Sequence, residues 1–184
     1  MKPYYQICML LGALSFSQSV SSEPAHYVGY EAFLVSYESK SYINSRIFLG
    51  SFFKQPSIFN PNWQDWRFGY ELGASGITAS PYENVHFRAW GLDGFWTAQY
   101  HFMPQWRLII KGGINAVDYK FKYQRRRYNY SEKSFKISPT SQLGISYNFK
   151  NGLEFGISLN HAFHVYAEGI HSIYGSAFLK YNFK

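Results

Sequence analysis

The feature that most constrains this sequence is its final segment, His171–Phe183, in which two kinds of side chain alternate. Successive side chains of a strand point to opposite faces, so a period of two predicts a strand. One face is apolar and comprises Ile173, Gly175, Ala177, Leu179, Tyr181 and Phe183. The other face is mixed and comprises Ser172, Tyr174, Ser176, Phe178, Lys180 and Asn182. Such a strand suits the wall of a membrane barrel, with the apolar face toward lipid and the mixed face toward a filled interior.

Residues 1–22 read as a cleaved secretory signal. Lys2 supplies a positive charge, and the apolar run Ile7–Phe16 is too short to span a membrane as a helix. Small residues mark a cut after Ser21 or Ser22. Cys8 is the single cysteine of the chain, and it would leave with the signal. We therefore expect residues 23–184 to form one domain without a disulfide or thiol chemistry.

The composition narrows the class of protein. Aromatic residues make up 21% of the chain, yet the mean hydropathy is only −0.29 and no long apolar segment follows residue 22. A helical membrane protein cannot have this composition, whereas a barrel can, because only alternate strand residues meet lipid. A secreted β-sandwich is the alternative, since the same alternation would bury its core. Aromatic residues recur at strand ends on the apolar face, which favours the barrel.

Alternation predicts about eight strands, the smallest common size for an outer-membrane barrel. The predicted strands are Tyr27–Glu38, Arg46–Phe53, Trp66–Ser75, His86–Phe102, Trp106–Tyr123, Ser134–Phe149, Leu153–Tyr166 and His171–Phe183. The second of these has an ambiguous phase, because both of its faces are apolar. Loops are predicted at Ser39–Asn44, Lys54–Gln64, Ile77–Asn84 and Gln124–Lys133, and a tight hairpin turn at Asn151-Gly152. The predicted fold is a single antiparallel transmembrane β-barrel with up-and-down topology.

Several runs resemble the small OmpA-like and OmpX-like barrels of Gram-negative outer membranes. They are FGYELGAS, FMPQWRLIIKGGINA, SQLGISYNFKNGLEFGISLNHAF and the ending GSAFLKYNF. The resemblance implies export to the outer membrane, contact with lipid and lipopolysaccharide, and a monomer without a peptidoglycan-binding domain. It also implies that Tyr181 and Phe183 form the signal read by the barrel assembly machinery, with Lys184 following. Host surface molecules are further partners that such barrels can meet.

Sorting charged residues by strand phase predicts an interior charge network with four acids and four bases. Its members are Glu31, Arg67, Glu71, Asp93, Arg107, Lys111, Glu154 and Lys180. Eight strands enclose an interior just wide enough for side chains to fill, so these charges should pair and close it. A gated or narrow ion path is the alternative. Lys180 has two candidate partners, Glu31 and Glu154.

A basic cluster crowds the end of one predicted hairpin and its loop. It comprises Lys120, Lys122, Arg125, Arg126, Arg127, Lys133 and Lys136. The chain has a net charge of +7, or 7 − 1 = +6 without Lys2. Because the chain is exported, we expect these residues to contact lipopolysaccharide phosphates or an anionic host surface rather than nucleic acid. A solvated loop with few lipid contacts is the alternative.

No catalytic, cofactor-binding or metal-binding residue is predicted. His161 and His164 have opposite phases, and His161 with His171 would make a weak zinc site without a third ligand. The adjacent His171 and Ser172 point to opposite faces, so the serine has no base to activate it. The sequence therefore predicts a non-enzymatic surface protein that serves membrane integrity, lipopolysaccharide contact or adhesion. A narrow channel for small solutes and a lipid-A-modifying enzyme are the alternatives.

Overall fold

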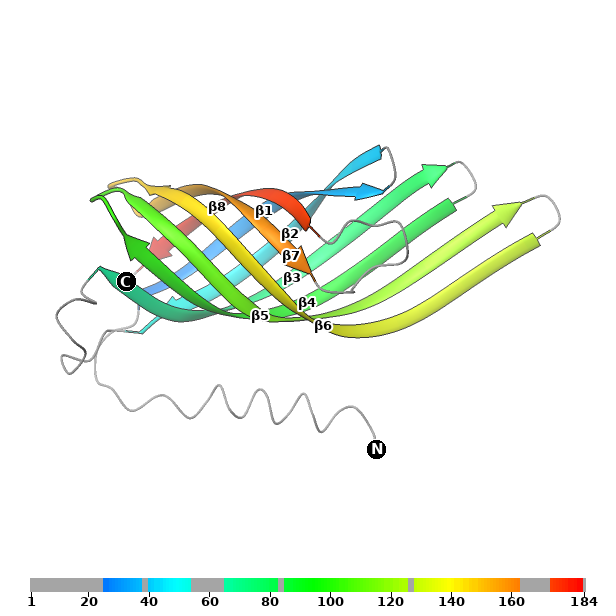
Figure 1. Ribbon diagram of the computed structural model, residues 1–184, viewed down its shortest axis with the longest axis horizontal. Coiled ribbons are helices and arrows are strands. Elements are labelled where there is room, and N and C mark those ends of the chain that lie inside the picture. Colours follow the sequence, from blue (N-terminus) through cyan, green and yellow to red (C-terminus); the bar gives the residue numbers. More distant parts are fainter. Residues whose placement is uncertain are drawn as a thin grey trace, which may run out of the picture.

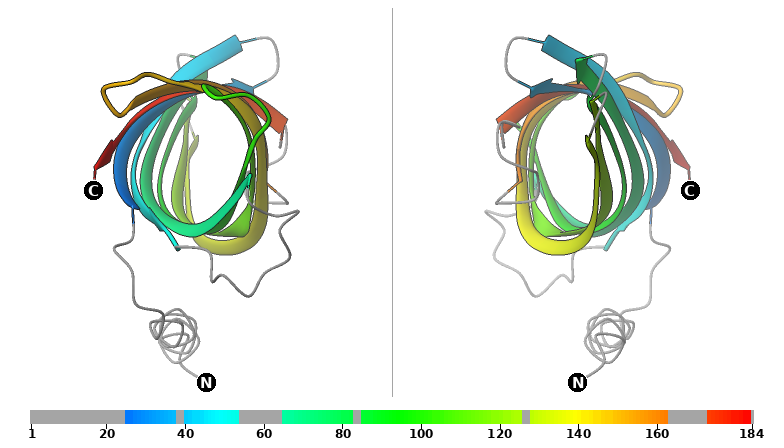
Figure 2. Two further views of the ribbon diagram at one scale, coloured as in Figure 1. Left: turned by 90° about the vertical axis from the view of Figure 1, so that its left-hand side faces the viewer. Right: turned by 90° about the vertical axis from the view of Figure 1, so that its right-hand side faces the viewer.

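The computed structural model describes residues 25–37, 40–53, 65–82, 85–125, 128–162 and 173–183, and these form a closed antiparallel barrel. Each strand pairs with its neighbours in chain order, and β1 pairs with β8 to close the ring (Figures 1 and 2). The strands are β1 (Ala25–Tyr37), β2 (Lys40–Phe52), β3 (Trp66–Tyr82), β4 (Val85–His101), β5 (Trp106–Arg125), β6 (Tyr128–Asn148), β7 (Leu153–Ala162) and β8 (Ile173–Phe183). The predicted all-β, up-and-down barrel of eight strands is confirmed. The predicted signal, residues 1–22, lies outside the described residues.

The two ends of the barrel differ. At the turn end, short turns at residues 102–105 and 149–152 join strands, and β1 begins beside the end of β8. Gly152 has a φ of 87° there, which the predicted Asn-Gly turn requires. At the opposite, hairpin end, β5 and β6 are the longest strands, at 20 and 21 residues, and protrude beyond the other strands (Figure 1).

Three predicted loops were wrong in the same way. Residues 40–44 belong to β2, residues 77–82 to β3, and residues 124–125 and 128–133 to β5 and β6. These polar stretches continue as paired strands past the barrel wall, where no lipid requires an apolar face. Pro81 lies in β3 where the register with β4 shifts between Ala79 and Tyr82, an irregularity of the kind that accommodates proline. The predicted connection at residues 54–64 lies outside the described residues.

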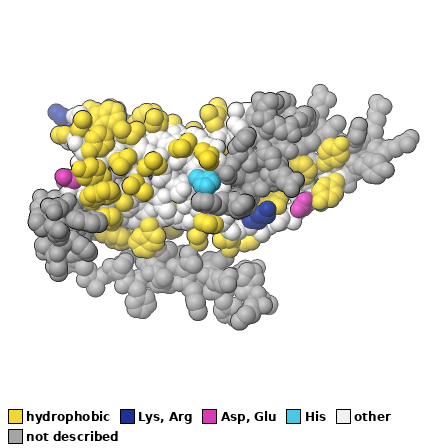
Figure 3. Space-filling view, viewed as in Figure 1, with side chains coloured by type: hydrophobic (Ala, Val, Ile, Leu, Met, Phe, Trp, Pro, Cys, Tyr) yellow, Lys and Arg dark blue, Asp and Glu magenta, His cyan; other side chains and the backbone are white. Residues whose placement is uncertain are grey.

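The outer face of the barrel carries a band of exposed apolar side chains. It includes Val28, Leu34, Ile47, Leu49, Leu92, Ile110, Ile114, Ile137, Leu143, Ile157, Leu159 and Leu179. In Figure 3, hydrophobic side chains gather over the left-hand part of the wall, and few charged side chains are visible, at the left margin and to the right of the middle. Among the described residues there is no helix that could cross a membrane.

The interior is layered along the barrel axis. An apolar cluster toward the turn end comprises Tyr27, Phe48, Phe52, Ile109 and Phe178. A second apolar cluster toward the hairpin end comprises Phe33, Val35, Ile77, Phe87, Ala89, Val117, Tyr119 and Ala162. Buried charged side chains lie between and beside these clusters.

Candidate functional site

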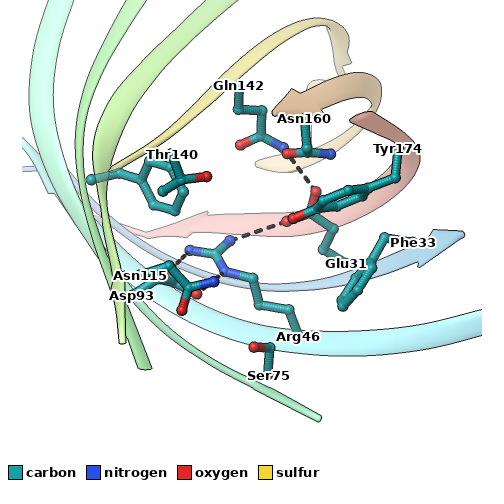
Figure 4. A pocket seen from close by; sticks show the side chains of 11 residues that line it. Glu31, Phe33, Arg46, Ser75, Asp93, Asn115, Thr140, Gln142, Asn160 and Tyr174 are labelled. Carbon is teal, nitrogen blue, oxygen red and sulfur yellow. Dashed lines mark hydrogen bonds and ion pairs between the residues drawn. The ribbon is translucent and has the colours of Figure 1, made fainter. Parts of the chain in front are cut away.

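Arg46 on β2 is the centre of the charge network inside the barrel. Its guanidinium donates to both oxygens of Asp93, from Nε at 2.8 Å and from Nη2 at 2.5 Å. Nη1 donates to Oε2 of Glu31 at 3.1 Å, and Nη2 lies 2.8 Å from Oε1 of Glu71. Arg46 is only 6% exposed, so one buried cation joins three carboxylates from three other strands. Figure 4 shows two of them, Glu31 and Asp93. Bidentate pairing of this kind is what the planar guanidinium favours.

The carboxylates on Arg46 have further partners, with one exception. Glu71 accepts bonds from Lys111 Nζ, at 2.8 and 2.9 Å, and from the Tyr27 hydroxyl at 3.1 Å. Glu31 Oε1 accepts bonds from Gln142 Nε2 and from a serine hydroxyl on β8. Asp93 has no other hydrogen-bond partner among the described residues, so its charge depends on Arg46.

A second group of charges surrounds Glu154 near the turn end. Arg107 Nη1 lies 2.6 Å from Oε2 of Glu154, and Lys180 Nζ lies 3.0 Å from Oε1. Ser146 and Asn182 also donate to this carboxylate. Of the two partners predicted for Lys180, the structure therefore selects Glu154. Lys180 also lies 4.7 Å above the ring of Tyr27, which joins this group to Glu71.

The observed charge network lacks one predicted member and contains one residue that was not predicted. Seven of the eight predicted interior charges are buried in the barrel, but Arg67 is exposed, and no ion pair links it to a described carboxylate. It has the predicted inward phase, but it is the second residue of β3, at the turn end, where the barrel opens toward water. Arg46 takes its place, so four acids still face four bases: Glu31, Glu71, Asp93 and Glu154 against Arg46, Arg107, Lys111 and Lys180.

Inward glycines make room for this packing. A Cβ added to Gly73 would lie 2.5 Å from Arg46 Nε and 2.5 Å from Asp93 Oδ1. Added Cβ atoms at Gly29 and Gly156 would collide with the rings of Phe48 and Phe178. Glycines therefore stand beside the largest side chains of the interior, which fill the space that a side chain at those positions would occupy.

Above Arg46, toward the hairpin end, the interior contains a polar pocket partly open to solvent. The space in it that the centre of a water molecule can occupy is only ≈ 20 Å³. Its lining includes Glu31, Asp93, Asn115, Thr140, Gln142 and Asn160 (Figure 4). Three members of the charge network, Glu31, Arg46 and Asp93, line this pocket.

The predicted basic cluster divides between two faces of the protruding sheet. Lys120, Lys122 and Lys133 are exposed on the outer face, in phase with the lipid-facing residues of β5 and β6. Lys136 has the inward phase and lies 5.5 Å above the ring of Tyr119. The side chains of Arg125, Arg126 and Arg127 lie outside the described residues.

One cation beside this cluster, Arg88, was not predicted from the sequence. Arg88 on β4 is exposed and lies directly opposite Lys120. On the inward-phase side, the hydroxyl of Tyr130 donates to Glu132 at 3.1 Å, and this hydrogen bond raises the pKa of the phenol. Arg88 has the same phase as the outward-facing tryptophans of its predicted strand. The alternation of side chains was therefore sufficient to predict that it faces outward.

The structure also describes the two residues predicted as the assembly signal and one of the three histidines considered as metal ligands. Tyr181 and Phe183 lie on the outer face at the end of β8, 48% and 43% exposed, and their role in assembly stays a prediction. His161 lies on β7 with the outward phase, whereas His164 and His171 lie outside the described residues. In the described part of the chain, no group of three or more His, Cys, Asp or Glu side chains could hold a metal ion.

No protein-family model and no curated protein matches this chain. Several solved structures match it. Ail, the attachment invasion locus protein of Yersinia pestis, matches with a TM-score of 0.57 and 14% identity, over 89% of this chain and 100% of Ail. Neisserial surface protein A matches with a TM-score of 0.54 and 9% identity, over 88% and 98% of the two chains. The N-terminal barrel domain of Pseudomonas aeruginosa OprF matches with a TM-score of 0.50 and 15% identity, over 88% of this chain and 100% of that domain. The resemblance to small outer-membrane barrels is therefore confirmed at the level of the fold.

Proposed function

We propose that this chain is a non-enzymatic surface protein of a Gram-negative outer membrane. Its interior is closed by side chains, and its function lies in contacts made by its outer surface. The observation that carries the proposal is the interior charge network. Its four acids and four bases are each less than 9% exposed, and each base contacts at least one of the acids. Paired charges in a barrel of this size stabilise the wall and leave little room for a solute.

The orientation follows from the end of the barrel at which the strands extend furthest. Outer-membrane barrels keep short turns on the periplasmic side and longer extensions outside. The turn end, with its connections at residues 102–105 and 149–152, therefore faces the periplasm. The protruding β5–β6 hairpin faces outward, and the apolar band of the wall lies in the membrane.

The chemistry of the hairpin end supports contact with anionic partners. Exposed arginine and lysine side chains lie on the outer wall just beyond the apolar band, where lipopolysaccharide carries its phosphates. Of the structural neighbours, Ail is an attachment protein and has been crystallised with the heparin analogue sucrose octasulfate. We propose lipopolysaccharide contact as the primary role of this chain, with membrane integrity and adhesion as its consequences.

Two measurements on one pair of strains test this proposal. Cells with and without the protein should yield the same lipid A mass spectrum, and the folded protein purified from those cells should retain lipopolysaccharide. An acyl chain gained or lost in the lipid A of expressing cells would show a lipid-modifying enzyme. Protein that carries no lipopolysaccharide through mild detergent extraction would contradict the contact role.

A further inference from the structure

Three cations lie in one row across three neighbouring strands of the outer wall. Arg88 of β4 is directly opposite Lys120 of β5, and Lys120 is directly opposite Lys133 of β6. All three side chains are exposed and share the phase of the lipid-facing residues on their strands. We name Arg88, Lys120 and Lys133 the outward cation row.

The row is not neutralised by the described part of the protein. Like charges directly opposite each other destabilise a sheet. Lys133 Nζ lies 3.5 Å from Oδ2 of Asp118, but no described carboxylate lies within ion-pair distance of Arg88 or Lys120. With Lys122 in the next outward-facing row, four cations on this part of the wall face one acid. An anion placed over the row would remove the repulsion.

The residues beneath the row place it at the edge of the apolar band. The next row toward the membrane is Trp90, Asp118 and Phe135, and the one below it is Leu92, Ala116 and Ile137. Trp90 Nε1 donates to Oδ2 of Asp118 at 3.2 Å, so the polar edge of this exposed indole lies in the row next to the cations. Tryptophan in this setting marks a membrane interface. The outward cation row is therefore at the height of lipid head groups.

We propose that the outward cation row is a binding site for the phosphates of lipid A, with acyl chains lying on the apolar rows beneath it. This rests on the proposed lipopolysaccharide contact and gives it a location. Arg88 can make bidentate contacts to a phosphate, and the two lysines supply point charges beside it. Asp118 holds Lys133 and Trp90 in place, so the acid positions the site without filling it.

The site is tested by native mass spectrometry of the refolded protein in phosphatidylcholine nanodiscs that contain purified lipid A. Three lipids are compared: lipid A with both phosphates, with one, and with none. The variant R88Q/K120Q removes two charges from the row. Its matched control, R67Q/K150Q, removes two exposed charges from the turn end. A shift in gel mobility on boiling confirms that each variant is folded.

We expect R88Q/K120Q to bind bisphosphorylated lipid A about tenfold or more weakly than the parent, because charge-assisted contacts are lost. R67Q/K150Q should bind as the parent does, and added salt should weaken parent binding to phosphorylated lipid A only. Equal losses in both variants, or equal binding of dephosphorylated lipid A, would overturn the site while leaving lipopolysaccharide contact intact. A parent that binds none of the three lipids would refute both the site and the proposed function. If R88Q/K120Q lost heparin binding but kept lipid A, the row would belong to a sulfated polysaccharide instead.

Discussion

Replacing Arg46 by methionine is the sharpest test of the interior network. The change keeps much of the side-chain volume but leaves three carboxylates without the cation that joins them. Glu31 and Glu71 keep other donors, whereas Asp93 loses every partner that the described residues give it. Removing one member of a buried ion pair costs about 3–5 kcal/mol. We therefore expect R46M to lower the free energy of unfolding by that amount, measured by urea titration of the barrel in phospholipid vesicles.

Two matched variants identify the cause. R67M removes an arginine of the same phase that is exposed at the turn end, so it should stay within about 0.5 kcal/mol of the parent. R46M/D93L removes both members of the pair, and an apolar replacement of a buried pair is often neutral. It should therefore regain much of the stability that R46M loses. A loss below about 1 kcal/mol in R46M, or a double variant less stable than R46M, would refute the reasoning.

Further predictions concern the glycines and the barrel as a whole. G73A should destabilise the protein by about 1–3 kcal/mol, because its Cβ overlaps Arg46 and Asp93. G112A, whose Cβ would meet nothing within 4 Å, should change stability by less than about 0.5 kcal/mol in the same titration. G152A should cost about 1–2 kcal/mol, because φ at this turn is 87°. The folded chain should migrate differently on a denaturing gel when it is not boiled, and identical bands would contradict a membrane-embedded barrel.

The alternation of side chains was sufficient to predict the barrel and most of its interior. Phase alone assigned Glu71, Asp93 and Lys111 to the interior, because the residues next to each of them along the strand form an apolar outer face. It did not assign Arg46, because its strand has apolar side chains on both faces. Phe48 and Phe52 fill the interior, while Ile47 and Leu49 face outward. The position of the first hairpin would have resolved this, since it sets Arg46 directly opposite Glu31.

The alternation of side chains could not predict where along the barrel axis a residue lies. Arg67 has the inward phase but lies at the mouth, and only the register with β4 shows this. The ends of β3, β5 and β6 were also misjudged, because strands that leave the membrane lose their apolar face while they keep their backbone pairing. The outward cation row depends on the same information. Arg88, Lys120 and Lys133 are far apart in sequence, and their alignment follows from the register of three strands.

Conductance across a planar lipid bilayer tests the central claim, that paired charges close the interior, most directly. The reconstituted protein should show no stable unitary steps, because Arg46, Glu71 and Lys111 are buried and paired across the lumen. E71Q weakens two of those contacts and serves as the control, with protein-free bilayers as the baseline. Stable steps in the parent whose size changes in E71Q would place an ion path through the network and contradict a closed barrel.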